Sequence, residues 1–301
     1  MKLQVVKLRP LWYLISGALL AFSFIFLASW NLKQGIEFTG GTLMAVHFEG
    51  ERPSVADTQS VLGSINEDIG KAVIQPAGDA DMQLRLQPIS EDAHQNILAA
   101  LNEKYGNVTE LRYDGIGPVI GKELRSKSIR GLVIVLLAIL LYVAYAFRKV
   151  SAPVRSWKYG LVTIIAAFHD VIVPVGVFAY LGHAYGTEIG TPFIAAILTI
   201  LGYSITDTIV VMDRIRENLL RTSATFSEIV EASVHQTFLR SFNTSMTTLL
   251  VLIAIFLYGG TTLREFTLTL IIGISVGTYS SIFIASPLLV SLEKLSKRRK
   301  K

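Results

Sequence analysis

Long apolar stretches alternate with polar segments along the 301-residue chain, and their lengths indicate what each can form. A helix that crosses a lipid bilayer needs about 20 predominantly apolar residues. Six stretches reach this length, and we expect each to be a membrane-spanning helix. They are residues 11–30, 129–147, 159–181, 192–212, 242–258 and 266–289.

The composition agrees with a multi-spanning membrane protein. The chain is 51% hydrophobic and only 17% charged, whereas soluble domains are usually about 25% charged. It has no cysteine, which excludes a disulfide framework and a thiolate metal site. The net charge of +5 is modest and does not require a nucleic-acid partner.

Lysine and arginine gather in alternate connections between the predicted spans. The connection between the third and fourth spans has none, and the one between the fifth and sixth has only Arg264. By the positive-inside rule, both termini are expected in the cytoplasm, with the first span retained as an anchor. The basic positions are Lys2, Lys7, Arg9, Arg148, Lys149, Arg155, Lys158, Arg214, Arg216, Arg221, Arg240 and the tail after residue 290.

The polar region between the first two spans has the pattern of a small folded domain. Alternation predicts strands, while helical periods behind Ser54 and Ser90 predict two capped helices. The order β-α-β-β-α-β is typical of a ferredoxin-like domain. The strands are expected at 42–48, 71–78, 82–88 and 107–115, and the helices at 54–69 and 90–106.

These patterns together predict the fold class and the domain organisation. We expect an α-helical integral membrane protein with six transmembrane helices and a ferredoxin-like α+β domain outside the membrane. The expected parts are a cytoplasmic N-terminus with the first helix (1–30), the extracytoplasmic domain (31–128), a five-helix bundle (129–290) and a basic cytoplasmic tail (291–301).

The predicted extracytoplasmic domain carries more acids than bases and no catalytic constellation. Residues 31–128 include 14 Asp and Glu but only 9 Lys and Arg. His47 and His94 stand alone, and no spacing predicts a triad, a phosphate-binding loop or a metal site. We therefore expect a binding or mechanical domain and no enzyme.

Four motifs stand out in order along the chain. "GIEFTGGT" follows the first span, "GIGPVIGKEL" precedes the second, "LGYSITDTIVVMDRIREN" lies in the fourth and "RSFNTSMTTLL" in the fifth. In this order they resemble the signatures of the SecD/SecF protein-export family, the first of which is usually written with Asp in place of Glu37, and the last two resemble its SecF branch. The signature positions are Gly35, Glu37, Phe38, Gly40, Gly41, Gly117 and Pro118.

The resemblance implies a function that composition and periodicity do not reveal. It implies a subunit in a bacterial inner membrane that uses the proton-motive force to promote preprotein translocation on the outer side. It also implies an RND-type half bundle that pairs with SecD. The SecYEG translocon, the preprotein and membrane lipids are the further expected partners. No cofactor or metal is expected; the coupling ion is H⁺, with Na⁺ as the alternative.

Asp207 is a carboxylate within the fourth apolar stretch. An acid inside a membrane helix is costly, so it is expected to face the bundle interior or a water-filled cavity. It lies roughly 9 Å along the helix from Asp213, which marks the expected end of the span. Tyr203, Ser204 and Thr208 lie within one turn and are candidates to hydrogen-bond it.

Arg240 is the nearest candidate cation, at the expected start of span five. Asn243, Thr244 and Thr247 follow on the same helical face. The resemblance implies a proton pathway through an Asp and an Arg that match Asp207 and Arg240. The alternatives are a structural polar pair for Asp207 and an ordinary topology-setting charge for Arg240.

His169 and Asp170 form a second candidate pair in span three, followed by a predicted kink at Pro174. Proton transfer and helix packing are both open for this pair. Gly273 and Gly277 in the last span fit close helix packing, with SecD as a suggested partner.

Two other function classes are compatible with parts of the sequence. One is an RND-type proton-coupled exporter half for lipids or small molecules, although its extracytoplasmic domain would be unusually small. The other is an assembly scaffold that transports nothing. Loss of activity without loss of assembly on replacing Asp207 would separate a transporter from a scaffold.

Overall fold

The computed structural model describes residues 4–66, 68–146 and 154–298. The chain divides into two compact units. One consists of residues up to Lys33 together with those from Arg130 onward, and we call it the membrane unit. The other runs from Gln34 to Ile129, and we call it the α/β domain.

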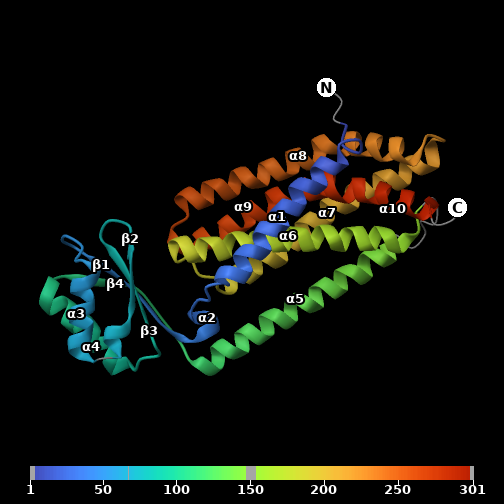
Figure 1. Cartoon of the computed structure of the whole chain (residues 1–301). Helices are drawn as coiled ribbons and strands as arrows, with labels where there is room; N and C mark the ends of the chain where they lie inside the picture. The colour runs from blue at the N-terminus through green and yellow to red at the C-terminus, as the bar shows by residue number, and fades with distance from the viewer. Residues whose placement is uncertain (1–3, 67, 147–153, 299–301) are drawn as a thin grey trace. The chain divides into compact units, whose positions relative to one another are not determined.

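The membrane unit is a bundle of long helices (Figure 1). Within the described residues, six helical segments are long and apolar enough to cross a membrane, which confirms the predicted number of spans. The helices are α1 (Arg9–Trp30), the second part of α5 (Pro118–Ala146), α6 (Ser156–Tyr185), α7 (Thr191–Arg221), α8 (Phe226–Tyr258), α9 (Thr261–Ser280) and α10 (Ser286–Arg298), with a π-helical turn at Ser281–Ala285 between the last two.

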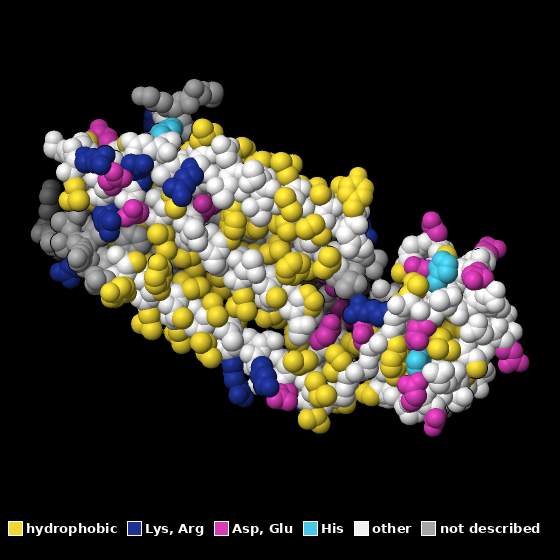
Figure 2. All heavy atoms as spheres, turned by 180° about the vertical axis from the view of Figure 1, so that it is seen from behind, with side chains coloured by type: hydrophobic (Ala, Val, Ile, Leu, Met, Phe, Trp, Pro, Cys, Tyr) yellow, Lys and Arg dark blue, Asp and Glu magenta, His cyan; other side chains and the backbone are white. Residues whose placement is uncertain are grey.

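The helices α6, α7 and α9 form the centre of this bundle. In each span that contains one of these three helices, about half of the most apolar segment is buried. In α1, α5 and α8 most of the corresponding segment is not buried. Figure 2 shows hydrophobic side chains spread over one face of the bundle, with charged side chains gathered toward its end. The open apolar faces are suited to lipid or to partner helices.

Glycines bring pairs of helices into close contact. A Cβ on Gly277 would lie 2.9 Å from the Ser204 Cβ, and one on Gly273 would lie 2.1 Å from the Ile200 Cδ1. The small-residue face of α9 is therefore occupied by α7 of the same chain. The suggestion that it packs against SecD is wrong, because no room remains there for another helix.

Helix α8 begins at Phe226 rather than at the predicted start of its span, Phe242. A capping box holds its first turn: the Thr225 side chain accepts from the Glu228 amide, and Glu228 accepts from the Thr225 amide. Arg240 consequently lies in the interior of a long helix and not at a helix start, which corrects the prediction. The apolar window alone missed the amphipathic first turns.

The α/β domain has the predicted β-α-β-β-α-β order. Its four strands form one antiparallel sheet in the order β2-β3-β1-β4. Two short helical segments were not predicted. The elements are α2 (Ile36–Thr39), β1 (Gly41–Phe48), α3 (Val55–Ile65), a 3₁₀ turn (Ile69–Lys71), β2 (Val73–Ala77), β3 (Asp81–Leu86), α4 (Glu91–Tyr105) and β4 (Val108–Ile116).

The core of this domain lies between the sheet and the helices α3 and α4. Met44, Val46 and Leu84 alternate with less buried positions on their strands and pack against Leu62 and Ile97. This is the period-2 pattern of a sheet covered on one face. The domain therefore has its own hydrophobic core.

The two family signatures meet within the α/β domain. Gly40 and Gly41 have φ of 75° and 140°, a backbone region that favours glycine. A Cβ on Gly40 would lie 2.7 Å from the Pro118 Cα, and one on Gly121 would lie 2.7 Å from the Gly40 nitrogen. The glycines therefore let α2 and the start of α5 touch backbone to backbone. Gly117 has no such contact within 4 Å.

Candidate functional site in the membrane bundle

Asp170 is the centre of a buried polar cluster that joins three helices. Its side chain is 0% exposed. It accepts hydrogen bonds from the Ser204 hydroxyl on α7 and from the Ser280 hydroxyl on α9, the latter at 2.7 Å. A buried charge or polar group is tolerated when its hydrogen bonds are satisfied. The cluster thus ties α6, α7 and α9 together.

His169 extends the same cluster toward α1. Its Nδ1 lies 3.0 Å from Asp170 Oδ1, and its buried Nε2 has no hydrogen-bond partner. The Tyr279 ring lies 6.3 Å from the imidazole, and the Tyr279 hydroxyl donates to the Trp12 carbonyl. The π-helical turn begins directly after Ser280, and such turns often occur at functional sites.

Asp207 lies one turn farther along α7 than Ser204, in a different environment. It is 7% exposed, and its Oδ2 is buried without a hydrogen-bond partner. The Ser241 hydroxyl on α8 approaches this carboxylate but makes no hydrogen bond of normal geometry. The charge of Arg240 also acts on Asp207, yet no ion pair joins them in the described structure.

The polar residues predicted to support Asp207 lie elsewhere. Ser204 donates to Asp170, and Tyr203 reaches Ser245 and Thr248 on α8, at 3.4 Å and 3.5 Å. Thr208 is buried, and within the described residues no hydrogen bond joins its side chain to Asp207. The spacing was compatible with contact, but Ser204 faces Asp170 on α6, and Tyr203 bonds to hydroxyls of α8 instead of to Asp207. The predicted hydrogen bonds to Asp207 are therefore wrong.

Arg240 belongs to a polar face of α8 that is exposed in this chain. Arg240, Asn243, Thr244 and Thr247 recur at the i, i+3, i+4 and i+7 spacing of one helical face, and all four are exposed. The Thr244 and Thr247 hydroxyls bond to carbonyls of α8 itself. Within the described residues, the Arg240 guanidinium and the Asn243 amide form no hydrogen bond or ion pair.

The histidines of the α/β domain have structural partners. His47 Nδ1 lies 2.6 Å from Asp81 Oδ1 across neighbouring strands. His94 is buried between Glu110 and Glu91, with Nε2 and Nδ1 at 2.8 Å and 3.0 Å from their carboxylates, and stacks on Tyr113. The described residues contain no group of three or more His, Cys, Asp or Glu side chains that could hold a metal ion.

We expect Glu110 and Glu91, through His94, to make the stability of the α/β domain pH-dependent. Burial by itself lowers the pKa of His94, but the hydrogen bonds and charges of Glu110 and Glu91 outweigh it and raise the pKa above 6.5. This stabilisation is fully present below the unfolded-state pKa and is lost as pH rises through the raised folded-state pKa. We expect hydrogen exchange in α4 and β4 to accelerate as pH rises through that range, after correction for intrinsic exchange.

His94→Gln provides the matched control for that measurement. Glutamine keeps a polar side chain but cannot become a cation, so the corrected exchange of the variant is expected to be flat over the same pH range. An unchanged pH dependence in the variant would assign the effect to another group.

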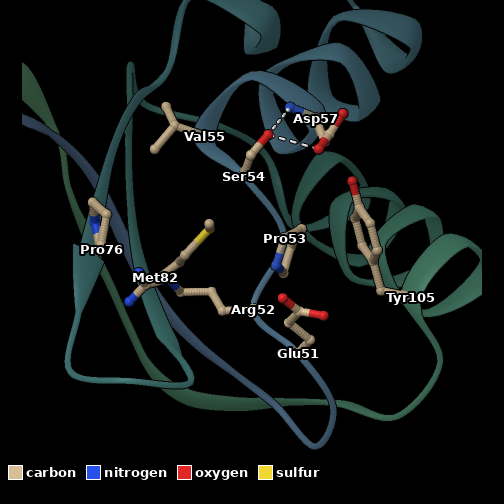
Figure 3. A pocket seen from close by; sticks show the side chains of 9 residues that line it. All are labelled: Glu51, Arg52, Pro53, Ser54, Val55, Asp57, Pro76, Met82 and Tyr105. Atoms are coloured by element: carbon tan, nitrogen blue, oxygen red, sulfur yellow. Dashed lines mark hydrogen bonds between the residues drawn. The ribbon is translucent and has the colours of Figure 1, made fainter.

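The α/β domain also carries an open cleft (Figure 3). Its volume is about 550 Å³, and it lies between the loop after β1, the start of α3, the β2–β3 hairpin and the end of α4. Pro53, Pro76, Met82 and Tyr105 supply an apolar lining, while the Ser54 side chain caps α3 and bonds to Asp57. Glu51, Arg52 and Val55 complete the lining.

The sequence matches known protein-export membrane proteins. The family model described as "Protein export membrane protein SecD/SecF, C-terminal" matches residues 96–295. The protein translocase subunit SecF of Thermobaculum terrenum is 42% identical over 302 residues, which cover 97% of this chain and 94% of the relative. The SecF of Synechocystis is 36% identical, covering 96% and 93%.

The fold matches a solved structure from the same group. The crystal structure of SecDF from Thermus thermophilus, described as a translocon-associated membrane protein, superposes with a TM-score of 0.85 at 33% identity. The match covers 98% of this chain but only 39% of the SecDF chain. A SecDF structure in a super-membrane-facing form matches with a TM-score of 0.70.

Proposed function

The chain belongs to the SecD/SecF family of protein-export membrane proteins, and on this premise we propose that, with SecD, it uses the proton-motive force to promote preprotein translocation. Its place as a SecF-type subunit of the protein translocase follows from relatives that match almost its full length. The exporter alternative is not favoured, because these relatives are named as SecF. The role is one of transport assistance, with no enzymatic reaction proposed.

One observation carries the proposal that a second subunit completes the site. Arg240 and Asn243 lie on an exposed helix face within the membrane unit, and their side chains form no hydrogen bond or ion pair within the described residues. An unpartnered cation and amide are costly against lipid, so this face is suited to another polar helix or a water-filled path. SecD is the proposed partner, since the solved SecDF chain is more than twice as long as the matched region.

We propose that Asp207 takes up and releases the translocated proton, with Arg240 as its electrostatic counterpart. Asp207 has an unpartnered oxygen and lies next to the exposed face, so protonation can change its contacts without dismantling the bundle. Each charge that crosses the membrane potential supplies about 2.3 kcal/mol per 100 mV. Na⁺ stays the alternative coupling ion.

Asp170 and His169 are proposed to hold the central helices in register beside this path. The complete enclosure of Asp170 and its bonds to α7 and α9 support a positioning role. The proton-transfer role that the sequence left open for the pair stays a prediction. Asn243 and Thr247 are proposed to line the partner side of the path.

The α/β domain is proposed to be a ferredoxin-like module on the outer side of a bacterial inner membrane, where it contacts the preprotein. Its element order and its β2-β3-β1-β4 sheet support this assignment. Both termini are then cytoplasmic, next to SecYEG. Part of the orientation rests on residues that lie outside the described ones: Lys2, Arg148, Lys149, Arg299, Lys300 and Lys301.

Site-specific photo-crosslinking tests the proposed partnership. A photoreactive amino acid at Asn243 is expected to capture SecD in native membranes, because this position faces the partner. The matched control is Leu137 on α5, an exposed apolar position in a different helix. Equal capture of SecD from both positions, or capture from neither while the protein is stably inserted, would contradict the proposed interface.

A further inference from the structure

A basic cleft lies at the end of the membrane unit where α8 begins. It has a volume of about 400 Å³ and is lined by the N-terminal segment, the first turns of α8 and Lys294 of α10. Lys7, Arg9 and Lys294 supply its cations, and Glu228 and Glu231 supply its acids. We call it the basic cleft.

The two acids of the basic cleft already accept hydrogen bonds from groups other than its cations. Glu231 accepts hydrogen bonds from the backbone amides of Val5 and Val6, one on each carboxylate oxygen, at 2.7 Å and 2.8 Å. His235 lies 3.5 Å from the same carboxylate. Glu228 accepts from the amide and the hydroxyl of Thr225, at 2.9 Å and 2.7 Å. Neither acid forms an ion pair with a cation of the cleft in the described structure.

The arginines at the neighbouring end of α7 are, in contrast, paired with acids. Arg214 and Arg221 pair with Glu217, and Arg216 pairs with Asp213. Lys7, Arg9 and Lys294 have no acid partner within the described residues. A topology-setting excess of positive charge accounts for bases at this end, but it does not explain why three unpaired ones surround one cavity.

The N-terminal segment is held so that the cleft is preformed. The Glu231 bonds fix residues 5 and 6, whose side chains are buried, and the Trp12 indole donates to the Val5 carbonyl at 3.1 Å. Lys7 and Arg9 follow directly on this fixed segment. A preformed cationic site loses less conformational entropy when an anion binds.

We propose that the basic cleft binds the phosphate-bearing headgroup of an anionic phospholipid. Leu8 and Leu11, which adjoin the two cleft bases in the chain, are 44% and 47% exposed and begin an apolar face of α1. A phospholipid satisfies both features, since its phosphate meets the cations while its acyl chains lie along the apolar face. A free phosphate would use the cations only.

The test compares lipid retention by the full chain in detergent micelles, measured by native mass spectrometry. Palmitoyl-oleoyl phosphatidylglycerol and the corresponding phosphatidylcholine are offered in equal amounts. We expect the wild type to retain phosphatidylglycerol in preference. The combined variant Lys7→Gln, Arg9→Gln, Lys294→Gln is expected to weaken that retention by about fivefold for each charge removed.

The matched control removes the same charge from the same end of the bundle. The variant Arg214→Gln, Arg216→Gln, Arg221→Gln is expected to retain phosphatidylglycerol as the wild type does, because these bases already have acid partners. Equal losses in both variants, or equal retention of the two lipids by the wild type, would overturn the site. Displacement of phosphatidylglycerol by millimolar inorganic phosphate would overturn its assignment to a lipid.

Folding of the variants is checked separately by circular dichroism and by elution volume. If the combined cleft variant does not fold, Lys294→Gln alone serves, since this side chain is exposed. This single replacement is then expected to weaken retention of phosphatidylglycerol by about fivefold. Retention at the wild-type level by that variant would count against the proposal.

Discussion

Replacing Asp207 by asparagine is expected to abolish the part of preprotein export that depends on the proton-motive force. Asparagine keeps the size and polarity of the side chain but can neither release nor take up a proton near neutral pH. Export into proteoliposomes or membrane vesicles that contain SecD, measured with and without an imposed proton gradient, should therefore give equal rates for the variant.

The matched control for Asp207 is Asp213 on the same helix. Asp213 is 56% exposed and pairs with Arg216, so Asp213→Asn should leave export driven by the gradient near the wild-type rate. Amounts of membrane-inserted protein and of bound SecD must be equal in all samples. Gradient-dependent export by Asp207→Asn at the wild-type rate would remove Asp207 from the proton path and support the scaffold alternative.

Asp170→Ala is expected to destabilise the membrane unit by about 2–4 kcal/mol. The change removes the common acceptor of Ser204 and Ser280 and the partner of His169, and each buried polar group left unpaired costs about 1–3 kcal/mol in soluble proteins and less in membrane bundles. The measurement is the denaturant dependence of unfolding in mixed micelles.

Asp170→Asn separates packing from proton transfer at this position. Its amide oxygen can still accept from both serines, so a positioning role predicts stability and gradient-driven export close to the wild type. If Asp170→Asn is as stable as the wild type but does not respond to the gradient, Asp170 carries the proton as well, and the positioning role alone is insufficient.

The apolar windows predicted the spans well because membrane thickness imposes a length that composition alone can reveal. They placed the start of α8 too late, since its first turns are amphipathic and are covered by other elements of the same unit. The order of strands and helices in the α/β domain could be predicted for a similar reason. Alternation and helix caps are local properties of consecutive residues.

The contacts of the candidate site could be predicted only in part. An acid in an apolar run marks Asp207 and Asp170 as residues of interest, because burying it is costly. The sequence did not reveal that Ser204 bonds to Asp170 rather than to Asp207, or that Ser241 faces Asp207. The hydrogen bonds of Ser280 and Tyr279 were missed as well, although Ser280 was among the small residues that recur in the last span.

The sequence by itself determined the membrane class, the six candidate spans and the α/β insertion, because hydropathy and periodicity act over neighbouring residues. Only the tertiary structure decided which polar groups meet. Such contacts depend on how helices far apart in the chain are rotated against one another, and here glycine contacts such as Gly277 against Ser204 set that rotation. The exposure of the helix face at Arg240 and Asn243 likewise depends on where the other helices pack.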